Sequence, residues 1–241
     1  MLNKFKRQLA KLFAKFVPQA LYEQLKINYA EKEDFSQVYF SQEGEEIILR
    51  RFFNYSNTGF FVDVGAHHPK RFSNTYILYK MGWRGINIDA LPGSMDSFNK
   101  IRPNDINIEA AISDNSENKI FYTFNEPALN TFDEYKMIEI VKNTNYKLTH
   151  KLEIKTTTLA EVLDVHLKEN QKIDFFSIDV EGLDLKVLKS NNWIKYKPKV
   201  IVIESSLPYL DSLNSDEVSI YLNKLGYKSY AKTFKSVFYT C

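Results

Sequence analysis

The chain of 241 residues has a single cysteine, Cys241, at its last position. One cysteine supplies no internal disulfide, no thiolate zinc site and no Cys-His nucleophile, and it fits a reducing cytoplasm. No apolar run reaches the roughly 18 to 20 residues that a membrane-spanning helix needs. The 32 lysines and arginines nearly balance the 30 aspartates and glutamates, so the overall charge gives no sign of a nucleic-acid partner. We therefore expect a cytoplasmic protein that binds no nucleic acid.

The N-terminal region predicts a basic amphipathic helix. Apolar residues from Leu2 to Phe16 recur at helical spacing with lysines and an arginine between them, and Pro18 ends the pattern. We expect a helical extension over residues 1–40, followed by one domain over residues 41–241. Two interpretations of the apolar stripe of this helix are open. It packs on its own domain or on a second subunit, or else it makes a peripheral contact with the inner face of an anionic membrane. The sequence leaves monomer and homodimer open.

From about residue 40 onward, apolar runs of strand length alternate with amphipathic segments of helix length, which is typical of βα units that form a mostly parallel sheet. The predicted strands lie near 59–64, 85–89, 106–112, 173–179 and 199–204. The predicted helices lie near 42–54, 74–81, 92–101, 132–143, 158–168, 183–191 and 214–225. Two β-rich runs around Lys235 predict a closing antiparallel hairpin, so the fold class is α/β with seven strands.

Residues 113–157 interrupt this alternation, because residues 119–124 resemble a strand and residues 128–131 resemble a turn. We expect an insertion over the sheet edge. Such segments often form a lid or a substrate wall, since ligands of open α/β folds bind outside the carboxyl ends of the strands.

Two carboxylates end the first two predicted strands. Asp63 lies in the run Gly59–Ala66, where the small residues Gly65 and Ala66 let the backbone approach a ligand. A carboxylate at this point repels a pyrophosphate and suits an amino-bearing ligand, such as the methionine moiety of S-adenosylmethionine. Asp89 ends the next strand, where it either accepts hydrogen bonds from ribose hydroxyls or caps the helix that follows.

The third and fourth predicted strands add further polar residues at the same edge. Small and polar residues from Ala110 to Asp114 are candidates for an adenine slot. Asp179 and Glu181 lie two residues apart at the end of the fourth strand, so strand alternation points both side chains the same way if the strand remains extended. Helix capping is the alternative role for such a pair.

Three spaced runs together resemble the FkbM family of methyltransferases: Ser41–Leu49, Phe61–His67 and Phe176–Gly182. The resemblance covers roughly residues 40 to 206. It implies the Rossmann-like class I methyltransferase fold with helices on both faces of the sheet, S-adenosylmethionine as cofactor, and O-methylation of a hydroxyl on a sugar or other small molecule. A glycan, a nucleotide-sugar or a related precursor is the expected acceptor.

The resemblance also implies a set of cofactor-binding residues. It places the methionine end of the cofactor against Asp63–His67, the ribose on Asp89 and the adenine near Ala111–Asp114, with Gln42, Asn74 and Thr75 closing over it. The full expected set is Gln42, Asp63, Gly65, Ala66, His67, Asn74, Thr75, Asp89, Ala90, Ala111, Ile112, Asp114 and Asp179. The chain departs from the family pattern at His67-His68-Pro69 and at Thr158-Leu159-Ala160, which bears on substrate specificity.

Transfer of a methyl group to a hydroxyl needs alignment and a general base. The candidates are Asp179, Glu181, His67 and His68, with Glu204 as an outer candidate, and we favour the two carboxylates of the fourth strand. We expect no resident metal, although the same side chains could ligate a divalent cation that orients a diol.

Two alternatives remain open from the sequence. A nicotinamide-dependent oxidoreductase shares the pattern of strand, acid and glycine, but the Gly-x-Gly-x-x-Gly fingerprint is missing after Gly65. A non-catalytic binding module on a decayed methyltransferase core would use the N-terminal helix and the aromatic surface instead. Cofactor binding separates this module from the enzyme.

Overall fold

The computed structural model describes residues 37–205, 207 and 209–241. The predicted N-terminal helix therefore lies outside the described residues. Tyr39–Cys241 forms one compact unit. Within the described ranges, no helix combines the length and the apolar character that crossing a membrane requires.

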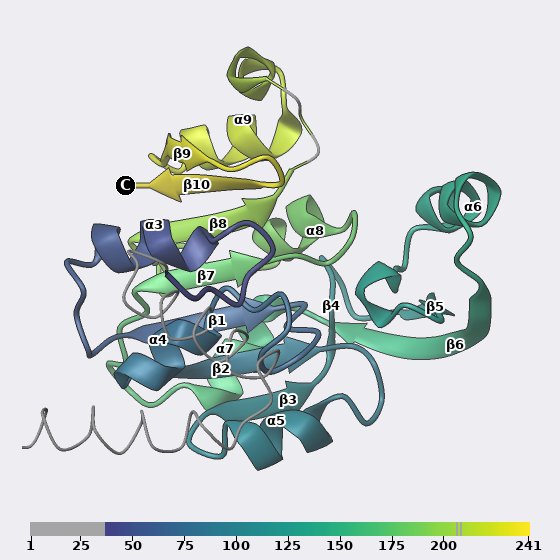
Figure 1. The fold of residues 1–241 in the computed structure, drawn as a ribbon, viewed down its shortest axis with the longest axis horizontal. Helices are drawn as coiled ribbons and strands as arrows, with labels where there is room; N and C mark the ends of the chain where they lie inside the picture. Colours follow the sequence, from purple (N-terminus) through teal and green to yellow (C-terminus); the bar gives the residue numbers. More distant parts are fainter. Residues whose placement is uncertain (1–36, 206, 208) are drawn as a thin grey trace, which may run out of the picture. The chain divides into compact units, whose positions relative to one another are not determined.

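A seven-stranded sheet forms the centre of this unit, with the strand order β3-β2-β1-β7-β8-β10-β9 (Figure 1). The first five strands in this order are parallel, and β10 runs antiparallel to both β8 and β9. The strands are β1 (Phe60–Val64), β2 (Arg84–Asp89), β3 (Ile106–Glu109), β7 (Phe175–Ile178), β8 (Val200–Glu204), β9 (Lys228–Lys232) and β10 (Ser236–Thr240). The predicted parallel sheet and closing hairpin are confirmed.

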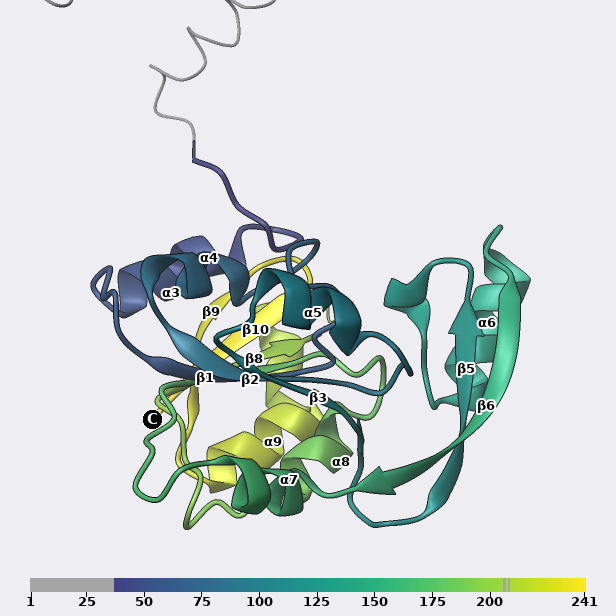
Figure 2. The same cartoon turned by 90° about the horizontal axis from the view of Figure 1, so that it is seen from below.

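Helices cover both faces of this sheet (Figure 2). One face carries α3 (Glu45–Phe52), α4 (Tyr76–Met81) and α5 (Met95–Ile101), and the other carries α7 (Leu159–His166), α8 (Asp184–Lys189) and α9 (Glu217–Lys224). Strand alternation explains the two layers, because Phe61 packs with the core of α3 and α4 while Val62 and Val64 pack with the core of α7 and α8. The Rossmann-like α/β fold is thus confirmed. The helix predicted over 214–225 is shorter than expected, since α9 begins only at Glu217. A 3₁₀ turn, η2 (Leu210–Asn214), precedes it.

A second sheet of three strands, with the order β4-β6-β5, extends from the edge of the first sheet. Its strands are β4 (Ala111–Ile112), β5 (Asn118–Phe124) and β6 (Leu148–Thr157). The 3₁₀ turn η1 (Pro127–Leu129) and the helix α6 (Glu134–Asn143) lie between β5 and β6 in the chain. The prediction of one strand over 106–112 is wrong at its end, because β3 stops at Glu109 and β4 pairs with β6 instead. The prediction also missed β6 as the partner of β5, since the mostly polar and exposed residues of β6 form no apolar run.

Candidate active site

An open cavity lies at the carboxyl ends of β1, β2 and β7, and the β5–α6 segment forms its opposite wall. The sequence-predicted residues that line it are Gln42, Asp63, Gly65, Ala66, His67, Asn74, Asp89, Ala90, Ile112, Asp179 and Glu181. Four other predicted residues, His68, Thr75, Ala111 and Asp114, are not among its lining residues.

The turn after β1 brings the ends of three strands together. Gly65 has a φ of 81°, and a Cβ atom there would lie 1.7 Å from the backbone oxygen of Asp179. Glycine is therefore required because β1 and β7 approach each other closely at this point. The sequence interpretation, in which the small residue makes room for a ligand, stays a prediction.

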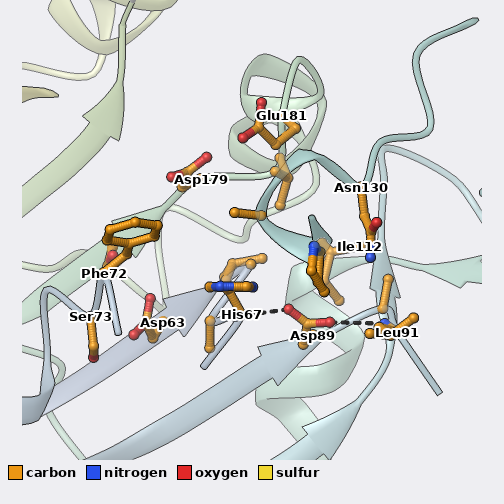
Figure 3. Close-up of a pocket in the computed structure, with 18 of the residues that line it drawn as sticks. Asp63, His67, Phe72, Ser73, Asp89, Leu91, Ile112, Asn130, Asp179 and Glu181 are labelled. Carbon is orange, nitrogen blue, oxygen red and sulfur yellow. Dashed lines mark hydrogen bonds between the residues drawn. The ribbon is translucent and has the colours of Figure 1, made fainter. Parts of the chain in front are cut away.

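Asp89 is held in place by backbone donors from two segments (Figure 3). The amide of His67 donates to Oδ2 and the amide of Leu91 donates to Oδ1, each at 2.8 Å. Burial raises the pKa of Asp89, and the two backbone hydrogen bonds oppose that shift. Each carboxylate oxygen keeps a lone pair for a further donor. The alternative role as a helix cap is wrong, since α5 begins after Ser94.

Asp63 borders the same cavity but is almost fully buried, and burial raises its pKa. Its Oδ2 accepts a hydrogen bond of 2.7 Å from the Thr75 hydroxyl. Thr75 is completely buried and supports Asp63 from behind. It does not line the cavity, although the sequence predicted it as a cofactor-binding residue.

The apolar part of the cavity includes two of the residues predicted for the adenine slot. Ala110 and Ile112 line the cavity, whereas Ala111 points into the protein interior, because side chains alternate along the chain at β4. Asp114 is exposed and accepts a hydrogen bond from Ser113. Of the residues predicted for the adenine slot, Ala110 and Ile112 therefore reach the cavity, and adenine binding there stays a prediction. Lining residues that the sequence did not single out for this slot are Leu91, Phe121, Pro127, Ala128, Asn130 and Phe132.

The acidic residues after β7 converge, although not for the predicted reason. Strand β7 ends at Ile178, and Glu181 has a φ of 54°, so the extended conformation does not persist. A turn nevertheless brings Asp179 and Glu181 to the same side (Figure 3). One oxygen from each of them and one from Glu204, at the end of β8, lie within 4.8 Å of one another. Such an arrangement of oxygens also meets the spacing of a cation site, and the absence of a resident metal stays a prediction.

This acidic cluster, Asp179, Glu181 and Glu204, has strongly perturbed protonation. Burial and the neighbouring charges of Glu204 and Glu181 raise the pKa of Asp179 well above its usual range. Burial and Glu204 also raise the pKa of Glu181, while Lys136 opposes the shift. Asp179 Oδ1 is buried and has no hydrogen-bond partner in the described part of the chain. Raised pKa values of this kind are common among carboxylates at functional sites.

Lys136, on the inserted helix α6, supplies a cation to this cluster. Its Nζ forms an ion pair with Glu181 and lies 3.8 Å from Oε2 of Glu204. Burial lowers the pKa of Lys136, but the carboxylates outweigh this effect and raise it. Lys136 could not be identified from the sequence, because a lysine on an amphipathic helix gives no signal of what it faces after folding.

The two adjacent histidines have different surroundings. His67 lines the cavity, and burial, together with the charges of Arg71 and His68, lowers its pKa to about 4. His68 accepts hydrogen bonds at Nδ1 from the amides of Lys70 and Arg71 within a turn. His67 is therefore a neutral imidazole at the cavity wall, and the structure does not bring His68 to the cavity.

The arrangement fits a nucleoside that carries an amino group. Asp89 offers acceptors for hydroxyls, Ala110 and Ile112 form an apolar surface for a base, and Asp63 offers a carboxylate for an ammonium group. Asp179 and Glu181 of the acidic cluster border the same space and offer a proton acceptor. The site can thus hold a cofactor of this kind beside a group that removes a proton.

One comparison with known proteins identifies the family. The family model described as the methyltransferase FkbM domain matches residues 63–229. No curated protein matches the chain. Among solved structures, precorrin-6y C5,15-methyltransferase from Geobacter metallireducens GS-15 is similar, with 14% sequence identity, a TM-score of 0.44, and coverage of 87% of this chain and 96% of that chain.

Proposed function

The chain belongs to the FkbM family of methyltransferases, and we propose that it transfers the methyl group of S-adenosylmethionine to a hydroxyl group of a sugar. The acceptor would be a glycan, a nucleotide-sugar or a related small-molecule precursor. One observation carries this proposal: a single cavity is bordered by Asp89 at the end of β2 and by Asp179 after β7. The first suits a ribose, and the second suits proton removal.

Residues at the ends of β1 and β2 would hold the cofactor. Asp89 would accept hydrogen bonds from the ribose hydroxyls with the lone pairs that the two backbone amides leave free. Asp63 would accept the amino group of the methionine moiety, and Ala110 and Ile112 would pack against the adenine. These assignments follow the chemistry that each lining group offers.

Proton removal would fall to Asp179. S-adenosylmethionine, when bound, supplies an electrophilic methyl group on its sulfonium. The protein has to orient the acceptor hydroxyl in line with that group and to take its proton. A general base works best when its pKa lies near the working pH, and burial raises the pKa of Asp179 in that direction. His67, with a pKa of about 4, is the weaker base.

A sugar acceptor is supported by the mixture of rings and carboxylates around the cavity. Phe72 and Phe132 line it together with Asp179 and Glu181. Aromatic faces pack against the C–H faces of a sugar ring, and carboxylates accept hydrogen bonds from its hydroxyls. A hydroxyl, unlike a neutral amine, needs a base when it is methylated, which agrees with the acidic cluster.

Calorimetry tests the cofactor part of the proposal. S-adenosylmethionine and S-adenosylhomocysteine should bind the wild type in the micromolar range, NAD should not bind, and Asp89→Ala should abolish binding. Glu109→Ala is the matched control, since Glu109 is paired with Asp89 in the sheet register but is exposed and outside the cavity. Binding of NAD alone, or equal affinities in both variants, would contradict the proposal.

An acceptor screen tests the sugar part. Free sugars, nucleotide-sugars, amines and thiols are incubated with S-adenosylmethionine, and products are detected by mass spectrometry as the gain of one CH₂ unit. We expect methylation at an oxygen of a sugar. Transfer only to nitrogen or sulfur acceptors would overturn this part and leave the methyltransferase assignment intact.

A further inference from the structure

A buried arginine lies behind the cavity, and the function proposed above assigns it no role. Arg102 is fully buried at the end of α5, and its Nε donates to Oδ2 of Asp105 at 2.9 Å. Its guanidinium carbon lies 5.1 Å from the ring centre of Phe61 and 5.3 Å from that of Tyr79. A charge at this depth is costly and calls for several partners.

One of these partners connects Arg102 to the cavity. Arg102 Nη1 donates to the Thr75 hydroxyl at 3.0 Å, and this hydroxyl lies 2.7 Å from Oδ2 of Asp63. Arginine is only a donor, so the Thr75 oxygen accepts from Arg102 and its single hydrogen is free to point to Asp63. The chain of donors therefore runs from Arg102 through Thr75 to the carboxylate that borders the cavity.

We propose that Arg102 and Thr75 are positioning residues that hold Asp63 as an oriented carboxylate for the amino group of the cofactor. This inference rests on the proposed function, because it takes Asp63 as the ligand of that amino group. Burial works against a charged Asp63, and the Thr75 hydrogen bond and the charge of Arg102 counter that effect by lowering the pKa of Asp63. The relay thus supplies, from inside the protein, the polar partners that water would give an exposed carboxylate.

Arg102 also has a structural role, which the test has to separate. Asp105, its ion-pair partner, accepts from the amide of Gly85 and from the side chain of Asn87 on β2. A change at Arg102 therefore disturbs the strand as well as the relay. Thr75 is the better position for the test, because its hydroxyl is the group that joins Arg102 to Asp63.

The experiment compares two ligands that share the adenosine part and differ in the amino acid part. S-adenosylhomocysteine carries the amino group, and methylthioadenosine does not. Calorimetry on Thr75→Val, which keeps the size of the side chain and removes its hydroxyl, should show S-adenosylhomocysteine binding weakened about tenfold or more. Methylthioadenosine should bind as it binds the wild type. Thr75→Ser keeps the hydroxyl and should restore wild-type affinity for both ligands.

Three results would overturn the inference. Unchanged affinity of Thr75→Val for S-adenosylhomocysteine would show that the relay does not reach the cofactor. Equal weakening of both ligands would assign Thr75 a purely structural role. Failure of the wild type to bind either ligand would overturn the proposed function and this inference with it. If Thr75→Val does not fold, Thr75→Ala serves in its place: it also removes the hydroxyl that joins Arg102 to Asp63 and should show the same selective loss.

Discussion

The two parts of the cavity that we propose for the cofactor and for the acceptor, called here the cofactor half and the acceptor half, are built in different ways. In the cofactor half, at the ends of β1 and β2, Asp89 is held by backbone amides and Asp63 by a buried side-chain relay. In the acceptor half, Asp179 and Glu181 follow β7, Glu204 ends β8, and Lys136 comes from the inserted helix α6. The first half depends on the central sheet and its core, whereas the second requires the insertion.

The halves also differ in how well their charges are compensated. Each oxygen of Asp89 has a donor in hydrogen-bond range. The acidic cluster brings three carboxylates together, and the pKa of Asp179 and that of Glu181 are both raised. A compensated carboxylate suits steady binding, and an under-compensated one suits proton uptake. Three substitutions examine this division of labour.

The largest effect should follow Asp179→Asn. Loss of the general base should lower the rate of methyl transfer by about 10² to 10⁴, with little change in affinity for S-adenosylhomocysteine, because the cofactor half is intact. Transfer rates to the acceptor from the screen and calorimetry measure the two quantities. Asp114→Asn is the matched control, since Asp114 is exposed and outside the cavity. Equal losses of rate and affinity would place Asp179 in the cofactor half.

The next effect concerns stability and should follow Arg102→Met. Asp105 would keep a buried charge without its ion-pair partner, so the free energy of unfolding should fall by about 3 to 5 kcal/mol in urea titrations. Lys199→Met breaks the ion pair with Asp174, in which the lysine side chain is 67% exposed, and should have a far smaller effect. Equal urea midpoints for the two variants would show that the network behind the cofactor half contributes nothing to folding.

The smallest effect is a shift in pH dependence and should follow Lys136→Met. Lys136 lowers the pKa of Asp179 and of Glu181 against the effects of burial and Glu204, so its removal raises both pKa values further. A general base is active when deprotonated, so the rate falls as pH drops through its pKa. The acid limb of the pH–rate profile should therefore move to higher pH. Lys136→Arg keeps the charge and should leave the limb in place; a shift of equal size there would exclude charge as the cause.

Much of the fold could be predicted because most of its helices and strands are marked by patterns of residues that are close together in the sequence. Apolar runs such as Phe60–Val64 and Val200–Glu204 are long enough to mark buried strands, and amphipathic segments between them mark helices. The pairing of β6 with β5 was not predicted, because the exposed polar residues of β6 do not show which strand they pair with. The break between β3 and β4 depends on the same non-local pairing.

By itself, the sequence determined the carboxylates at strand ends, since parallel strands bring their carboxyl ends to one edge of the sheet and thereby bring Asp63, Asp89 and Asp179 to one cavity. Tertiary structure alone decided which neighbours these carboxylates have. Thr75 and Arg102 meet behind Asp63, and Lys136 meets Glu181 from the inserted helix. The physical reason is that protonation and orientation depend on burial and on donors contributed by segments far apart in the sequence, and neither appears until the chain has folded.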